Sequence, residues 1–83
     1  HGTGVNPENR ILKEELKTQL TEALSMLTEK EKTVVLLYYY EDLTLKEISR
    51  VMEVSESRIS QLHSKALTKM RRCMNDNFAL MMG

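Results

Sequence analysis

Six polar side chains recur three and four residues apart between positions 57 and 68, a spacing that places them on one side of an α-helix. They are Ser57, Ser60, Gln61, Ser64, Lys65 and Thr68. Hydroxyls, an amide and an ammonium group can enter a groove of a duplex and hydrogen-bond to base edges or phosphates. This side of the helix is therefore a candidate surface for contacting nucleic acid.

Two short helices joined by a tight turn must position that surface. The stretch 44–67 predicts one helix from Leu45 to about Met52 and a second from about Glu56 past Leu67. The apolar residues of both helices fall on one inward side. They are Leu45, Ile48, Met52, Val54, Ile59, Leu62 and Ala66. The pattern is typical of a helix-turn-helix motif with a polar recognition helix.

The ends of these helices carry their own signals. Thr44 and Glu47 form a capping box before the first helix, and Ser55 caps the second. Glu53 lies where such motifs usually place a glycine in a left-handed conformation. A non-glycine residue there tolerates strain of about 1 kcal/mol, and two outcomes are open: the structure bears that strain, or the turn is reshaped.

A longer amphipathic helix is predicted in front of the motif. Asn6 and Pro7 are a strong helix start, and leucines and alanines at helical spacing extend the pattern to about Met26. Nothing on this helix suggests chemistry, so we expect it to cover the core.

The apolar run 34–40 is predicted to form a further helix enclosed by its neighbours, because Thr28 and Glu31 make a second capping box before it. The run ends in three adjacent tyrosines, Tyr38 to Tyr40, which we expect mainly to pack in the core with satisfied hydroxyls. Successive helical residues lie about 100° apart, so at least one of them should be exposed at the rim.

The recognition helix is expected to continue to about residues 75–77. Cys73 continues its inward series as a small core residue, and a basic cluster of Lys69, Arg71 and Arg72 suits the carboxyl end of the helix dipole. We therefore predict an all-α fold, a small bundle of four to five helices that contains the helix-turn-helix.

The predicted domain spans residues 6–75. Residues 1–5 resemble the remnant of an expression tag, so the chain is expected to be cut from a longer protein. Residues 76–83 form an apolar tail, which either packs back on the first helix or binds a partner.

Composition restricts the possible functions. With 83 residues and one cysteine, the chain is one small domain without an internal disulfide or a structural zinc site, and a reduced intracellular setting is the simpler interpretation. No apolar run approaches the length needed to cross a bilayer. The net charge is zero, but the charges are unevenly distributed. Residues 1–43 hold five basic and eight acidic residues, whereas residues 44–72 hold seven basic and three acidic residues. That asymmetry suits contact with DNA at one end and with protein at the other.

An enzyme is not expected, and neither a cofactor nor a metal is implied. No glycine lies between Gly4 and Gly83, so a phosphate-cradling loop is missing, and the carboxylates are scattered rather than paired. His63 lies beside the polar surface. Two interpretations of it are equally consistent with the sequence: a contact to phosphate, and a solvated surface histidine without a partner.

Residues 27–72 resemble region 4 of bacterial sigma factors, and the segment VSESRISQLHSKAL (54–67) points to the flagellar, or motility, class. The resemblance implies recognition of the promoter −35 element, with the second helix of the motif in the major groove. Carried onto this chain, the base-facing residues are Glu56, Ser57, Ser60 and Gln61, with Arg58 and Lys65 near the backbone or base edges. Ser64, Lys46 and Arg50 complete the expected DNA-binding set.

The chain departs from primary sigma factors, which have arginines at the positions of Glu56 and Ser60. Arginine favours guanine, so their absence, with Gln61 available for adenine, predicts an A/T-rich −35 sequence. The resemblance further implies double-stranded promoter DNA, the flap of the RNA polymerase β subunit and a small anti-sigma protein as partners. It also implies a cytoplasmic location at the nucleoid.

Two other functions remain open. The motif could be the output domain of a dimeric transcriptional regulator that binds a palindromic site through a tail-mediated dimer. Alternatively, the chain could be a helical interaction domain whose basic end is incidental, in which case DNA binding would be absent even at low salt.

Overall fold

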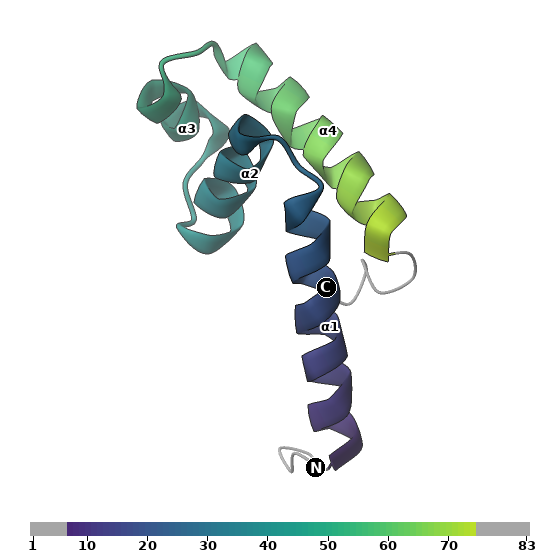
Figure 1. Cartoon of the computed structure of the whole chain (residues 1–83). Coiled ribbons are helices and arrows are strands. Elements are labelled where there is room, and N and C mark those ends of the chain that lie inside the picture. The colour runs from purple at the N-terminus through teal and green to yellow at the C-terminus, as the bar shows by residue number, and fades with distance from the viewer. Residues whose placement is uncertain (1–6, 75–83) are drawn as a thin grey trace.

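A computed structural model describes residues 7–74, and the side chains of residues 13–74. Every element in this range is helical: α1 (Pro7–Ser25), α2 (Glu29–Val35), the π-helical turn η1 (Leu36–Tyr40), α3 (Leu45–Met52) and α4 (Glu56–Met74). Figure 1 shows α2, α3 and the start of α4 grouped at one end, while α1 projects away from them. The predicted all-α fold class, with four to five helices, is confirmed.

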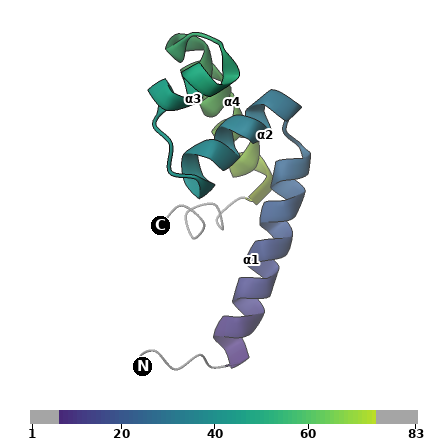
Figure 2. The same ribbon diagram turned by 90° about the vertical axis from the view of Figure 1, so that its left-hand side faces the viewer.

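Helix α1 ends within one residue of the predicted boundary, and backbone hydrogen bonds from Met26 to Ala23 and from Leu27 to Leu24 close its last turn. Ala23 and Leu27 are buried, whereas Leu16 and Leu20 are half-buried against the same cluster. Figure 2 shows the purple half of α1 extending beyond the other helices. Only the carboxyl half of α1 therefore covers the core.

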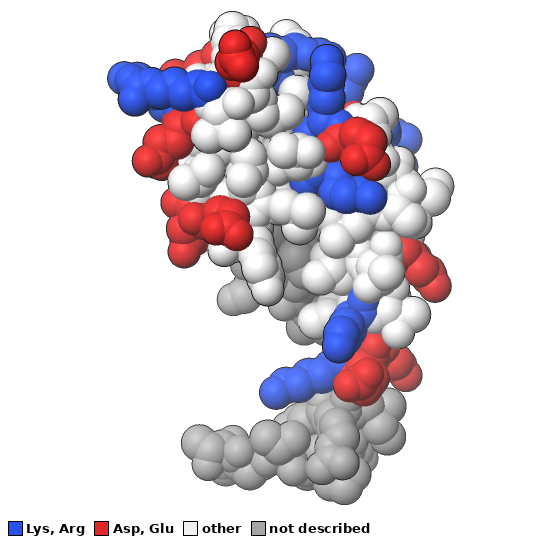
Figure 3. All heavy atoms as spheres, turned by 60° about the vertical axis from the view of Figure 1, so that its left-hand side comes forward, with Lys and Arg blue, Asp and Glu red and all other residues white. Residues whose placement is uncertain are grey.

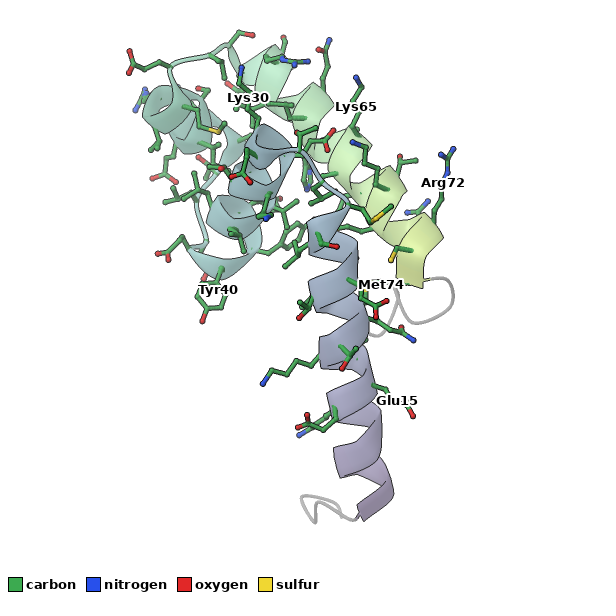
Figure 4. All side chains as sticks on the ribbon, viewed as in Figure 1. Glu15, Lys30, Tyr40, Lys65, Arg72 and Met74 are labelled. Atoms are coloured by element: carbon green, nitrogen blue, oxygen red, sulfur yellow. The ribbon has the colours of Figure 1, made fainter. Side chains whose placement is uncertain are left out.

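The apolar run after Thr28 is buried on one side only. Val34 and Val35 of α2 are buried, but Leu36 and Tyr40 are 41% and 83% exposed. The expected enclosure of this helix on all sides is therefore wrong for η1, because no described helix packs against its outer face. The exposed tyrosine at the rim is confirmed in Tyr40, which points away from the bundle (Figure 4).

The sequence also did not predict that the run would end as a π-helical turn. The backbone N–H of Glu41 donates to the carbonyl of Leu36 at 3.2 Å, five residues back, which widens the helix there. Asp42 follows with φ of 58°, a left-handed conformation that an aspartate tolerates better than most residues. The chain thereby turns sharply from η1 towards α3.

The predicted helix-turn-helix is confirmed in its boundaries and its local devices. Thr44 and Glu47 form a complete capping box before α3. Glu53 has φ of 57° and ψ of 44°, the left-handed conformation expected at the turn. The Ser55 hydroxyl accepts from the N–H of Arg58 at 3.0 Å and caps α4. The turn therefore keeps the usual geometry despite the missing glycine.

Helix α4 contacts α1, α2 and α3, and its inward side serves two apolar clusters. The first cluster, around Ile59 and Leu62, consists of Val34, Ile48, Ile59 and Leu62. The second cluster consists of Ala23, Leu27, Val35, Ala66, Met70 and Met74. The predicted inward series is confirmed at Ile59, Leu62, Ala66 and Met70, while Cys73 is only half-buried at the edge of the second cluster.

Three predictions lie outside the described residues: the tag remnant at 1–5, the cap at Asn6 and the apolar tail at 76–83. No helix in the described part of the chain is both long and apolar enough for a membrane span.

Candidate nucleic-acid interface

The outer side of α4 carries the polar residues that the sequence placed there. Ile59, Leu62 and Ala66 hold the opposite side of the helix in the core, where each is at most 3% exposed. All six members of the predicted polar surface are exposed: Ser57, Ser60, Gln61, Ser64, Lys65 and Thr68. In Figure 4 the Lys65 side chain points away from the bundle. Hydrogen-bonding groups thus line one continuous side of an anchored helix.

The remaining predicted DNA-binding residues lie around the start of α4 and on α3. Glu56 and Arg58 are exposed in the first turn of α4, and Lys46 and Arg50 are exposed on α3. Glu56 and Lys46 line the same open hollow, so the starts of α3 and α4 are neighbours. All nine residues of the predicted set are therefore accessible.

A second open hollow extends this surface along α4. Ser64, Lys65 and Arg72 line it together with Thr28 at the start of α2. Lysine ammonium, guanidinium and hydroxyl groups are the usual partners of phosphate oxygens. The polar side of α4 thus continues beyond the residues that the sequence selected.

Basic and acidic side chains are mixed on the face of the molecule that Figure 3 shows. In the view of Figure 3, Lys and Arg side chains gather mainly over the upper end of the molecule, with Asp and Glu side chains among them.

Lys69 has a partner that the sequence did not reveal. Its ammonium donates to the Glu31 carboxylate at 2.7 Å, and the Thr28 N–H donates to the same oxygen at 2.9 Å. Burial raises the pKa of Glu31, but these hydrogen bonds outweigh it and hold that pKa below its ordinary value. Lys69 is therefore not simply part of a basic cluster at the end of α4; it ties α4 to α2.

His63 belongs to an aromatic cluster with Tyr38 and Tyr39. The Tyr39 hydroxyl and His63 Nε2 share a hydrogen bond of 2.9 Å, and the ring centroids of Tyr38 and His63 are 4.8 Å apart. Burial lowers the pKa of His63, whereas burial and the neighbouring Tyr38 raise the pKa of Tyr39. The interpretation of His63 as a solvated surface histidine is therefore wrong. Neither that interpretation nor the phosphate contact anticipated its hydrogen bond to Tyr39.

An apolar hollow of about 110 Å³ lies on the side of the molecule formed by α1, the end of α2, η1 and α4. Its lining is almost wholly apolar: Leu20, Leu24, Val35, Leu36, Tyr39, Tyr40, Leu67 and Met70. Two of these lining residues, Leu36 and Tyr40, are exposed. Such a hollow favours an apolar segment of another protein rather than a charged ligand.

Residues 13–74 contain no group of three or more His, Cys, Asp or Glu side chains that could hold a metal ion.

The sequence model "Sigma-70, region 4" matches residues 23–72, more than half of the chain. This chain belongs to the sigma-70 region 4 family. The match covers the end of α1, both capping boxes and the complete helix-turn-helix.

Curated relatives of this region 4 chain are named as sigma factors. The RNA polymerase sigma-D factor of Bacillus subtilis is 53% identical over 70 residues, which cover 84% of this chain and 28% of that protein. The RNA polymerase sigma factor FliA of Yersinia enterocolitica is 47% identical over 72 residues, which cover 87% of this chain and 31% of that protein. FliA of Escherichia coli K12 is 50% identical over 66 residues, which cover 80% of this chain and 28% of that protein.

The predicted resemblance to region 4 of the motility class is confirmed, and the alignments are longer than the stretch 27–72 on which it was based. The region 4 chain spans less than a third of the length of these relatives. Among solved structures, no match to the chain was found.

Proposed function

We propose that this region 4 chain recognises the −35 promoter element within an RNA polymerase holoenzyme and takes part in transcription initiation without catalysing a reaction. One observation carries the proposal: a family-matched helix-turn-helix presents all nine predicted DNA-binding residues to solvent. The relatives are named RNA polymerase sigma factors, so we expect the chain to act in the cytoplasm at the nucleoid. The domain that does so is proposed to span residues 6–75.

Base readout is assigned to the first two turns of α4. Glu56, Ser57, Ser60 and Gln61 are exposed there, and the start of a recognition helix is the part that reaches base edges. Gln61 can pair with adenine through both its amide oxygen and its amide nitrogen. With no arginine at positions 56 and 60, we expect an A/T-rich −35 sequence rather than a guanine-centred one.

Phosphate contacts are assigned to four cations and one hydroxyl that flank the base-reading turns: Lys46, Arg50, Arg58, Ser64 and Lys65. They come from both helices of the motif, so they can hold the two strands that border the groove. Their role is to fix the register of α4 in the groove, not to select a sequence.

The polymerase contact is assigned to the apolar hollow and its rim. The hollow lies on the η1 side, and its lining residues Tyr40 and Leu36 are exposed. An apolar helix of the β-subunit flap has the chemistry to fill it, and the same surface suits a small anti-sigma protein that competes with the flap. Nothing in the described residues specifically favours the dimeric regulator.

The first test is a selection of random duplexes by a holoenzyme whose sigma factor carries this region 4. We expect enrichment of an A/T-rich −35 element. Return of a guanine-centred −35 element would sink the assignment of Glu56, Ser60 and Gln61. No enrichment upstream of the start site would remove the proposed function itself.

A pair of substitutions separates the two kinds of contact. Gln61→Ala should weaken discrimination between the selected and mismatched duplexes by about 1–3 kcal/mol, the value of a good base contact. Lys65→Ala should weaken binding to all duplexes similarly and lower the salt slope by about one unit. If both variants lost only thermal stability, the outer side of α4 would not be the reading surface.

A further inference from the structure

Tyr39 lies between the two functional ends of the molecule. On one side it lines the open hollow that also contains Lys46 and Glu56, both assigned to DNA contact. On the other side it lines the apolar hollow together with Leu67. The Tyr39 hydroxyl also bonds directly to α4, through His63 Nε2.

His63 occupies a matching position on α4. It follows Glu56 by seven residues and precedes Leu67 by four, so the three side chains share one side of the helix. The hydrogen bond from Tyr39 therefore reaches α4 midway between the end that faces DNA and the end that lines the apolar hollow. His63 is half-buried there, and its ring also packs on Tyr38.

The backbone that carries Tyr39 is not an ordinary α-helix. Residues 36–40 form a π-helical turn, and such turns occur frequently at functional sites. Conversion of this turn to α-helical bonding would rotate Tyr39 relative to α4, and Tyr39 is already 38% exposed. A ligand in the apolar hollow would contact Tyr39 and so favour the ring position that it contacts.

We infer that the Tyr39–His63 hydrogen bond couples the two sites: an apolar segment in the hollow holds Tyr39 on His63 and thereby fixes α4 in the orientation that binds the −35 duplex. His63 is then a positioning residue, which acts on DNA through the helix and not by direct contact. The inference rests on the proposed function. By linkage, the duplex must strengthen flap binding by the same factor.

The test measures that factor with this chain, the isolated β-flap domain and the duplex enriched in the selection. Duplex affinity is determined at low salt with and without saturating flap domain. We expect the flap to tighten duplex binding at least about fivefold. Tyr39→Phe and His63→Leu should each reduce the coupling factor about two- to tenfold, the range for one neutral hydrogen bond.

Two further variants separate this bond from general packing. His63→Gln keeps an acceptor for the Tyr39 hydroxyl and should restore most of the coupling. Tyr38→Phe removes a hydroxyl for which no hydrogen bond is found in the described structure, from a ring that also packs on His63, and should leave the coupling factor unchanged. Tyr39→Phe with the wild-type coupling factor would overturn the inference, as would an equal loss in Tyr38→Phe.

An NMR measurement on the unsubstituted chain tests the coupling even where the variants fail to fold. The imidazole ¹⁵N shifts of His63 report its hydrogen bonding, and flap domain added without DNA should change them. Unchanged shifts at saturating flap would overturn the coupling while leaving the proposed function standing. Absence of any binding, to flap or to duplex, would instead remove the proposed function and the coupling with it.

Discussion

Two helices of this chain begin with a capping box of the same kind. Only one of the two boxes has a carboxylate that is buried in the core. Thr28 and Glu31 open α2, and Thr44 and Glu47 open α3, each with both reciprocal hydrogen bonds. Glu31 is 3% exposed and bonds to Lys69 on α4, 38 positions away. Glu47 is exposed, and its carboxylate serves the cap of its own helix.

The pKa values of the two carboxyls fall for different reasons. For Glu47, hydrogen bonds from Thr44 are the main cause. For Glu31, burial raises the pKa, and the bonds from Lys69 and Thr28 more than offset that rise. A capping box thus starts a helix by local chemistry, and it becomes a tertiary anchor only where another helix brings a cation to it.

The largest expected effect comes from a change that leaves both boxes intact. Ile59→Ala should lower the free energy of unfolding by about 2–5 kcal/mol, because Ile59 is fully buried in the cluster formed by α2, α3 and α4. Val51→Ala on the 61% exposed Val51 of α3 is the control and should stay within about 0.5 kcal/mol. Urea denaturation measures both, and similar losses would contradict the assignment of the core.

The next effect tests the difference between the boxes directly. Glu31→Gln should cost about 1–3 kcal/mol of unfolding free energy, because it replaces a buried, charge-assisted bond and leaves the Lys69 ammonium without its carboxylate. Glu47→Gln keeps a residue type that capping boxes accept, and no ion pair is lost, so it should change stability little. Equal losses would mean that the Lys69 bond adds nothing.

Acid titration should sharpen the same contrast. The folded pKa of Glu31 lies below the ordinary value of 4.5, so its contribution is fully present above about pH 4.5 and is lost as pH falls through the folded pKa. His63, whose folded pKa is also lowered, already costs stability as pH falls below about 6.5, where the unfolded chain takes up its proton. Unfolding free energies between pH 7 and 3 should show both losses, and Glu31→Gln should reduce the lower one.

The smallest effect concerns how the helices begun by the two boxes end. Asp42 follows η1 and Glu53 follows α3, and both have positive φ. Glu53→Gly should raise the unfolding free energy by up to about 1 kcal/mol, because glycine removes the left-handed penalty at the cost of a more flexible unfolded chain. Asp42→Gly should gain less, since aspartate tolerates this conformation. A loss of stability in Glu53→Gly would contradict the strain at that turn.

Local devices were predictable from the sequence. Both capping boxes and the cap at Ser55 depend on residues within four positions of each other, and all three were predicted correctly. For Glu53 the sequence left two outcomes open, a left-handed residue or a reshaped turn, and the structure has the first. The outward residues of α4 followed from helical periodicity for the same reason.

Features that depend on distant residues were not predictable. No pattern around Lys69 indicates Glu31, and none around His63 indicates Tyr39, because each pair is joined only by the packing of α4 on the earlier helices. The π-helical turn was missed because the run 34–40 reads equally well as an ordinary helix. The DNA-contact roles themselves remain predictions, which exposure of the nine residues permits.

We propose that two separate surfaces of this chain serve polymerase and DNA. NMR shift mapping with the isolated β-flap domain tests it most directly. We predict saturable binding whose largest shifts fall on Leu36, Tyr39, Tyr40 and Leu67 around the apolar hollow. Smaller shifts, transmitted through His63, are expected along α4 between Ser57 and Lys65. No binding by the folded chain at millimolar flap domain, or shifts confined to that outer side of α4, would contradict the claim.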